Sequence, residues 1–196
     1  MLRIGITGGI GSGKTTVCRI FEKLGVPVYY SDREAEILIN TDPSIKRQLQ
    51  KYFGKEIYSN RGLDKPKMRK AVFGNKEALK QLNAVVHPLV IQHFDNWAQQ
   101  HHTAPYVIKE AALLFESGSH KQLDAVIMVS APKVQRIQRI LKRDKRKLAE
   151  IEKIISGQWP ESKKRKLSQY QISNSNKDLI TPQILELDHH LRKVKK

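Results

Sequence analysis

The stretch GITGGIGSGKTT (residues 5–16) decides how the rest of the chain is interpreted. A glycine, four further residues and then Gly13, Lys14 and Thr15 match the pattern G-x-x-x-x-G-K-[ST] in full. Alternating apolar residues over 2–7 predict a strand in front of the pattern, and apolar residues at helical spacing predict a helix behind it. A glycine loop between a strand and a helix is the setting that a phosphate-binding loop requires.

Each residue type in this loop has its own task at a phosphate group. Glycines permit a tight turn and bring backbone N–H groups against phosphate oxygens, while the following helix directs its positive N-terminus at the same anion. Lys14 supplies a cation to the β- and γ-phosphates, and the Thr15 hydroxyl is the expected ligand of Mg²⁺. The loop is therefore predicted to bind a nucleoside triphosphate. The predicted nucleotide-binding residues are Gly11, Ser12, Gly13, Lys14, Thr15 and Thr16.

The rest of the chain continues an α/β pattern around one helical insertion. A strand over 26–30 completes a βαβ unit with the loop, which predicts a parallel sheet. Residues 33–102 carry apolar residues at helical spacing and predict a mostly helical insertion. The runs KRDKRK (142–147) and SKKRK (162–166) are strongly basic. Further strands of the sheet are predicted at 106–109, 125–129 and 170–172.

Composition indicates anionic partners and a reducing compartment. The 196 residues include 36 Lys and Arg against 19 Asp and Glu, a formal net charge of +17. The single cysteine, Cys18, excludes an intramolecular disulfide, and no apolar run approaches the roughly 20 residues that span a bilayer. The basic runs contain no aromatic residues, which argues against nucleic acid as the partner. We expect a cytoplasmic monomer or weak oligomer that binds small anionic molecules and neither membrane nor nucleic acid.

Binding of a triphosphate leaves several activities open. The guanine-reading pattern N-K-x-D is absent, because NKEA (75–78) and NKDL (176–179) both fail it, and no D-x-x-G switch is present. A protein kinase uses a different glycine loop. The remaining alternatives are a small-molecule kinase and an ATPase coupled to a mechanical or nucleic-acid task.

Asp32 follows the second predicted strand, so it lies at the carboxyl edge of a parallel sheet, the edge that also carries the phosphate loop. A carboxylate at this edge accepts the proton of a hydroxyl that attacks the γ-phosphate, or orders Mg²⁺ through water. The alternative is an N-cap, because an Asp in front of the helical stretch REAEIL (33–38) commonly has that role. The spacing alone leaves both roles open.

The loop with the strand behind it (GITGGIGSGKTTV and LGVPVYYSD) resembles the opening of dephospho-CoA kinases. Three further stretches resemble that family in the same order: GLDKPKMRKAVF…LNAVVHPLV (62–90), KEAALLFESG (109–118) and VQRIQRILKRD (134–144). Ala112 stands where the family usually has proline, and Gln169 stands where it has aspartate.

This resemblance implies a P-loop NTPase fold with a parallel sheet, a helical substrate-binding insertion and a basic lid. It implies phosphorylation of the ribose 3′-hydroxyl of dephospho-CoA by ATP with Mg²⁺, the last step of coenzyme A biosynthesis. The parts expected from it are a core of residues 1–32, 103–142 and 167–196, a dephospho-CoA domain of 33–102 and a lid of 143–166.

Three further residues are candidates for binding the acceptor substrate. Arg69 is expected to pair with substrate phosphate through its planar fork, or else to be a solvated surface arginine. His87 is expected to contact the substrate, to brace a loop at Pro88 or to cap a helix end. Glu116 is assigned to positioning the substrate or to a pair with an arginine of the insertion. Glu110 is a weaker candidate for holding Mg²⁺-bound water or orienting the substrate.

Arg143 completes the predicted catalytic set with Lys14 and Asp32. It lies one helical turn from Arg139 at the start of the lid, and mobile arginines stabilise the charge that develops in phosphoryl transfer. Most of the neighbouring lysines are interpreted as a solvated basic face.

Overall fold

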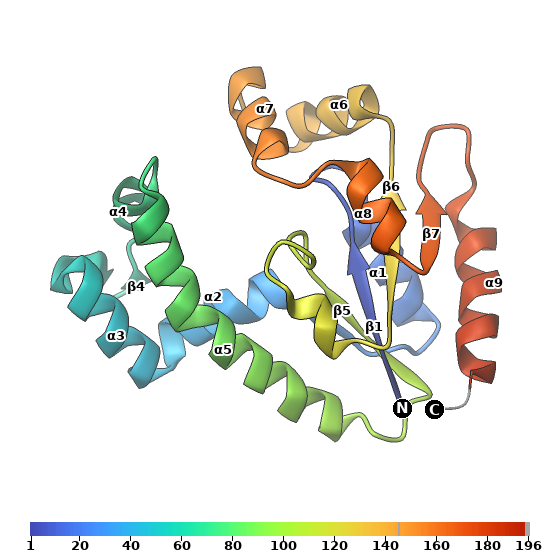
Figure 1. Ribbon diagram of the computed structural model, residues 1–196, viewed down its shortest axis with the longest axis horizontal. Helices are drawn as coiled ribbons and strands as arrows, with labels where there is room; N and C mark the ends of the chain where they lie inside the picture. Colours follow the sequence, from blue (N-terminus) through green and yellow to red (C-terminus); the bar gives the residue numbers. More distant parts are fainter. Residues whose placement is uncertain (145, 195–196) are drawn as a thin grey trace. The chain divides into compact units, whose positions relative to one another are not determined.

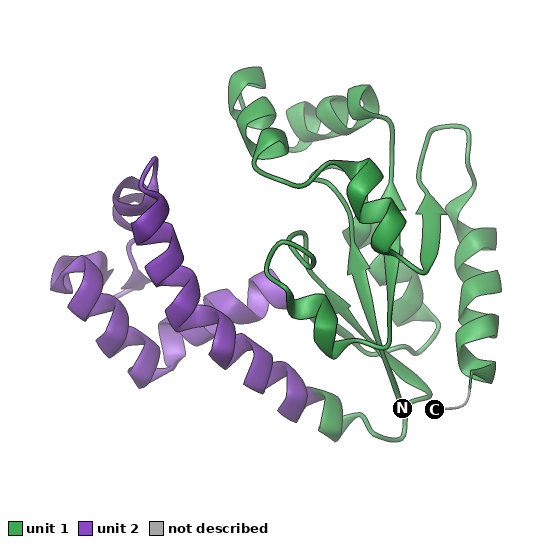
Figure 2. Ribbon diagram, viewed as in Figure 1, with its two compact units in different colours: residues 1–30, 98–196 green, residues 31–97 purple. Residues whose placement is uncertain are grey.

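The computed structural model describes residues 1–144 and 146–194, so Lys145 of the expected lid lies outside the described residues. The chain forms two compact units, one of residues 1–30 with 98–196 and one of residues 31–97 (Figures 1 and 2). No helix within the described ranges combines the length and the apolar character needed to cross a membrane.

The first unit is built on a five-stranded sheet in the order β2-β5-β1-β6-β7. All four neighbouring pairs are parallel, which confirms the predicted parallel sheet. Because the strands are parallel, their carboxyl ends meet at one edge, and the glycine loop follows the central strand at that edge. The strands are β1 (Leu2–Thr7), β2 (Val28–Tyr30), β5 (Tyr106–Glu110), β6 (Ala125–Ser130) and β7 (Tyr170–Ser173).

Apolar side chains from the two faces of this sheet belong to two separate clusters. Ile127 and Val129 of β6 belong to the cluster that also contains apolar residues of α1 and α9, whereas Val126, directly before Ile127, belongs to a cluster with Leu114 and Phe115. This alternation follows from the two-residue period of a strand. The helices of this unit are α1 (Lys14–Lys23), η2 (Ser119–Gln122), α6 (Lys133–Asp144), α7 (Leu148–Ser156), α8 (Glu161–Leu167) and α9 (Ile180–Lys193).

A buried polar network anchors α9 to the sheet and to the end of α1. The Tyr106 hydroxyl donates to Asp188 Oδ1 at 2.6 Å, and Arg192 Nε donates to Asp188 Oδ1 and Oδ2 at 2.9 and 2.8 Å. Arg192 Nη2 donates to the carbonyl of Leu24 at 2.8 Å. Burial, together with the Asp188 carboxylate, raises the pKa of the Tyr106 hydroxyl well above its ordinary value. The hydroxyl therefore stays protonated and donates its hydrogen bond throughout the neutral range.

We expect Asp188→Asn to lower the free energy of unfolding by about 1–3 kcal/mol, because it removes the charge of an acceptor shared by two donors in a largely buried site. The measurement is urea unfolding followed by circular dichroism. Glu36→Gln is the matched control, because it neutralises an exposed carboxylate whose pair with Lys65 contributes about 0–1 kcal/mol. Equal losses in the two variants would contradict an anchoring role for Asp188.

The second unit is mostly helical, as predicted, and has its own small core around Ile45, Leu49 and Ile57. Asp42 and Asp64 cap two of its helices, since Asp42 Oδ1 accepts from the backbone N–H of Ser44 and Ile45 and Asp64 Oδ1 accepts from Lys67. A hairpin of two-residue strands was not predicted. The elements are α2 (Ser31–Thr41), α3 (Pro43–Phe53), η1 (Lys55–Ile57), β3 (Tyr58–Ser59), β4 (Gly62–Leu63), α4 (Lys65–Val72) and α5 (Lys76–Gln100), which extends into the first unit.

The expectation of a loop or a helix end at Pro88 is wrong, because Pro88 lies inside the 25-residue helix α5. Proline lacks the N–H that would bond one turn back, so one helical hydrogen bond is missing there. The helix continues through this point because apolar residues on both sides, such as Val86 and Val90, are buried. His87 therefore neither braces a loop nor caps a helix end.

Candidate active site

The glycine loop turns through two residues in the left-handed region, Gly11 with φ of 79° and Gly13 with φ of 92°. Its turn is closed by a hydrogen bond from Ser12 N to Gly9 O at 3.1 Å. Helix α1 begins directly behind it, with no side chain capping its first N–H groups. These N–H groups and the positive end of the helix therefore suit the binding of an anion in the loop.

Lys14 contacts both the loop and a carboxylate from the neighbouring strand. Its Nζ donates to the Gly8 carbonyl at 3.1 Å and lies 3.9 Å from Glu110 Oε1, and both side chains are about nine-tenths buried. Glu110 ends β5, which pairs with β1, and this pairing brings it to the loop. From the sequence Glu110 is the weaker of two candidate carboxylates, and the contact with Lys14 makes it the carboxylate beside the loop.

Thr15 and Thr16 lie exposed in the first turn of α1, with Thr15 directly beside Lys14 in sequence. The described chain has no cluster of three or more His, Cys, Asp or Glu side chains that would hold a metal by themselves. Mg²⁺ bound with a nucleotide does not need such a cluster, since it takes one or two protein oxygens and completes its shell with phosphates and water. An exposed hydroxyl and a carboxylate beside the loop fit that requirement.

Asn174, directly after β7, packs against the other side of the loop. Its Nδ2 donates to the Ser12 carbonyl at 2.8 Å, and a Cβ built on Gly13 would overlap this amide. Arg139 Nη2 donates in turn to the Asn174 carbonyl at 2.9 Å. Ser12 Oγ and Arg139 Nη1 are buried and have no hydrogen-bond partner among the described residues.

The departures from the family pattern have structural explanations. Gln169 Oε1 accepts from the backbone N–H of Val126 at 2.9 Å, so this side chain ties the start of β7 to β6. The carbonyl of Ala112 accepts from Thr7 Oγ1 at 3.3 Å and from Lys164 Nζ at 2.9 Å. These carbonyl contacts hold the segment at Ala112 without the rigidity of a proline.

Glu116 is engaged by the segment around α8. Its Oε1 lies 2.7 Å from Lys164 Nζ and accepts from the Trp159 backbone N–H at 2.9 Å, while Oε2 is buried and has no partner in the described part of the chain. Within the first unit, the cation that pairs with Glu116 is Lys164. Lys164 is fully buried and also departs from the expectation of a solvated lysine face.

Arg143 lies at the end of α6 and is mostly exposed, with a bidentate contact to its neighbour. Its Nε and Nη2 lie 2.5 and 2.9 Å from the two carboxylate oxygens of Asp144, and Arg146 approaches the same carboxylate at 3.4 Å. The hydrogen bond from Arg143 holds the pKa of Asp144 below its usual range, so the pair is ionised at neutral pH. Such an exposed pair holds Arg143 only weakly.

Asp32 lies in the first turn of α2, one residue past its start at Ser31, and not at the N-cap position. Its carboxylate makes no hydrogen bond or ion pair with the described residues, in contrast to the capping carboxylates of Asp42 and Asp64. Asp32 lines a pocket of about 580 Å³ together with Arg33 and Asn40. An acidic residue in the first turn is favoured by the helix dipole, and its free carboxylate is compatible with chemistry.

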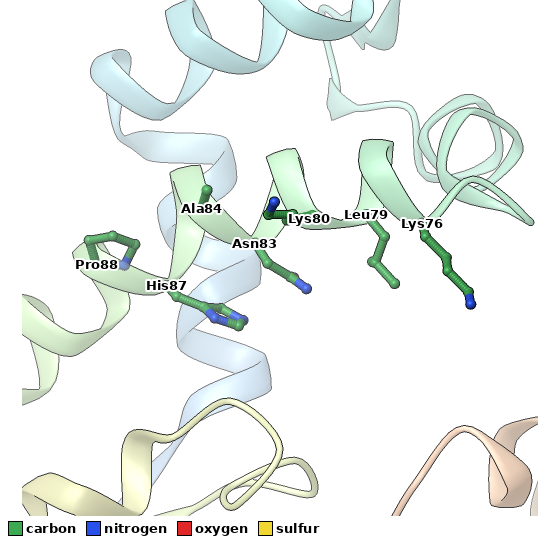
Figure 3. Close-up of a pocket in the computed structure, with 7 residues that line it drawn as sticks. All are labelled: Lys76, Leu79, Lys80, Asn83, Ala84, His87 and Pro88. Atoms are coloured by element: carbon green, nitrogen blue, oxygen red, sulfur yellow. The ribbon is translucent and has the colours of Figure 1, made fainter.

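The two acceptor-site candidates each line a further pocket of the second unit. Arg69 borders a pocket of about 400 Å³ that also contains Lys70 and Phe73. His87 borders one of about 500 Å³, and its imidazole projects to the same side of α5 as Asn83 and Lys76 (Figure 3). Both pockets combine cationic side chains with apolar surface.

Comparison with known proteins agrees with this geometry. The family model described as dephospho-CoA kinase matches residues 2–179. A dephospho-CoA kinase of Bacteroides fragilis is 36% identical over 95% of this chain and 91% of its own length, and one of Porphyromonas gingivalis is 33% identical over 98% and 95%.

Solved structures show the same relationship. The protein TT1252 of Thermus thermophilus superposes with a TM-score of 0.82 at 31% identity, covering 100% of this chain and 98% of its own. A dephospho-CoA kinase of Campylobacter jejuni gives 0.72 at 25% identity, covering 97% of each chain. A shikimate kinase of Acinetobacter baumannii, at 0.57 and 18% identity over 100% and 96%, shares the P-loop kinase fold. This chain belongs to the dephospho-CoA kinase family.

Proposed function

We propose that this protein transfers the γ-phosphoryl group of ATP to the ribose 3′-hydroxyl of dephospho-CoA, which gives CoA and ADP in the last step of coenzyme A biosynthesis. The observation that carries the proposal is a complete phosphate loop, with Lys14 beside Glu110, in a chain that the family model matches over residues 2–179. The small-molecule partners are therefore ATP and dephospho-CoA.

The phosphate loop binds the donor in this proposal. Backbone N–H groups from Gly11 to Thr16 surround the phosphates, and Lys14 exchanges its contact with the Gly8 carbonyl for the β- and γ-phosphate oxygens. Mg²⁺, when bound with ATP, neutralises charge on the β- and γ-phosphates. Thr15 Oγ1 is the proposed protein ligand of that ion, with Glu110 placed to accept hydrogen bonds from its water.

Asp32 is the proposed general base. Its carboxylate takes the proton of the 3′-hydroxyl as the new O–P bond forms and the bond from the γ-phosphorus to the β–γ bridging oxygen breaks, so that the electron pair leaves with ADP. Arg143 stabilises the charge that develops on the transferring group. Arg69, His87 and Glu116 position dephospho-CoA, with Arg69 forming a planar fork to its phosphates.

The test is a panel of acceptors in an assay that couples ADP release to a spectroscopic signal. We expect dephospho-CoA to support turnover at least 100-fold faster than nucleoside monophosphates, shikimate or water, with single-stranded DNA giving no stimulation. Phosphorus NMR of the product then locates the new phosphate on the 3′-oxygen. Equal ATP turnover with and without dephospho-CoA would refute the proposal.

A further inference from the structure

Both backbone polar groups at the tip of the phosphate loop are held by side chains from distant parts of the chain. The N–H of Ile10 donates to Gln158 Oε1 at 3.0 Å, and the carbonyl of Ile10 accepts from Arg136 Nε at 2.9 Å. Arg136 lies on α6, and Gln158 lies in the connection between α7 and α8. The tip therefore has a fixed position before any nucleotide arrives.

Arg136 is itself held in place. The residue is 5% exposed, and its Nη1 lies 2.7 Å from Glu161 Oε1 at the start of α8. Hydrogen bonds between ionised groups are about twice as strong as neutral ones, and a buried guanidinium that loses its only carboxylate partner is strongly disfavoured. Arg136 therefore forms an ion pair with Glu161 and donates a hydrogen bond to the carbonyl of Ile10.

The guanidinium also lies directly against the loop backbone. A Cβ built on Gly9 would lie 2.5 Å from Arg136 Cζ and 2.7 Å from its Nη1. Gly9 is not part of the G-x-x-x-x-G-K-[ST] pattern, and it is not among the glycines with positive φ in the described chain. A side chain at position 9 would therefore have to displace the Arg136 guanidinium from the loop.

We propose that Arg136 and Gln158 are positioning residues of the nucleotide site, which hold the loop tip so that the N–H groups behind it face the phosphates, and that Glu161 fixes Arg136 for this purpose. Neither side chain needs to touch the nucleotide. The effect on affinity arises because a loop that is already ordered loses less conformational freedom on binding. The inference rests on ATP binding by the loop but not on the identity of the acceptor.

The test compares three variants. Arg136→Met replaces the guanidinium but keeps an unbranched stem of similar length, and the other two are Gln158→Met and Glu161→Gln. Calorimetric titration with a non-hydrolysable ATP analogue gives the dissociation constant, steady-state kinetics give kcat and the KM for dephospho-CoA, and thermal unfolding gives Tm. We expect Arg136→Met to raise the dissociation constant about 10- to 100-fold and Gln158→Met about 3- to 10-fold. The KM for dephospho-CoA should stay within about twofold, because the acceptor gains nothing from an ordered loop tip.

Glu161→Gln should weaken binding through Arg136 alone, so adding it to Arg136→Met should have no further effect on the dissociation constant. Arg192→Met is the matched control, because it breaks an arginine–carboxylate pair of the same unit on α9. It should lower Tm and leave the dissociation constant unchanged.

A dissociation constant within twofold of wild type in Arg136→Met, or an equal rise in Arg192→Met, would overturn the proposal in favour of a purely structural role. If Arg136→Met fails to fold, Gln158→Met decides, because it removes one hydrogen bond made by a half-buried side chain. A wild-type protein that binds the analogue but does not phosphorylate dephospho-CoA would refute the proposed function and leave this inference standing.

Discussion

Asp32→Asn is expected to lower kcat by about 10²–10⁴-fold while the affinity for ATP stays unchanged, as for the loss of a general base. The amide has nearly the same size as the carboxylate but cannot accept the hydroxyl proton. The structure strengthens this expectation because Asp32 lies past the N-cap position and its carboxylate has no partner among the described residues. Single-turnover kinetics at saturating ATP and dephospho-CoA measure the effect.

A second aspartate of the same unit provides the control. Asp42 is an N-cap whose carboxylate accepts from Ser44 and Ile45, and asparagine caps a helix about as well as aspartate. Asp42→Asn should therefore retain kcat. If Asp32→Asn also retains kcat, Asp32 returns to a structural role in the first turn of α2.

Arg143→Ala is expected to lower kcat by about 10³-fold, the effect of removing an arginine that stabilises a transferring phosphoryl group. Its contact with Asp144 is exposed, so the guanidinium can exchange that carboxylate for a phosphate at little cost. Arg143→Lys should restore little of the activity, because a point charge lacks the planar fork. The measurement is kcat at several salt concentrations.

Lys147→Gln tests the alternative that the basic segment only attracts its substrates. A steering lysine should change kcat/KM slightly, and added salt should reduce that change. If Arg143→Ala behaves like Lys147→Gln, and salt reproduces its effect in the wild-type protein, then Arg143 contributes attraction and no chemistry.

Local patterns in the sequence were enough to predict the phosphate loop, the strands of the sheet and the helical character of residues 33–102. These features depend on neighbours within one or two turns of the chain, where apolar spacing and glycine chemistry are directly visible. The hairpin β3–β4 was not predicted, because a strand of two residues is too short to show an alternation of apolar and polar residues. The prediction of a helix end at Pro88 was wrong, because the burial of apolar side chains on both sides of Pro88 outweighs the loss of one helical hydrogen bond.

The parts of the site that could not be predicted depend on contacts between distant segments. Glu110 reaches Lys14 only because β5 lies next to β1, and a single sequence does not reveal that order. Arg136 and Lys164 look like any other cations of a basic chain, yet both are buried against carboxylates. A spacing rule cannot distinguish a buried lysine from a solvated one when its partner lies 48 residues away in sequence, as Glu116 does from Lys164.

The strand order also determines when the strands of the sheet can pair during synthesis on the ribosome. The first two strands of the chain, β1 and β2, are separated in the sheet by β5, so they cannot pair with each other. Both neighbours of β1 follow residue 105 in the sequence, and synthesis proceeds at about 5–20 residues per second. The nascent strand β1, with the phosphate loop attached, must therefore wait unpaired for several seconds while residues 31–97 are made.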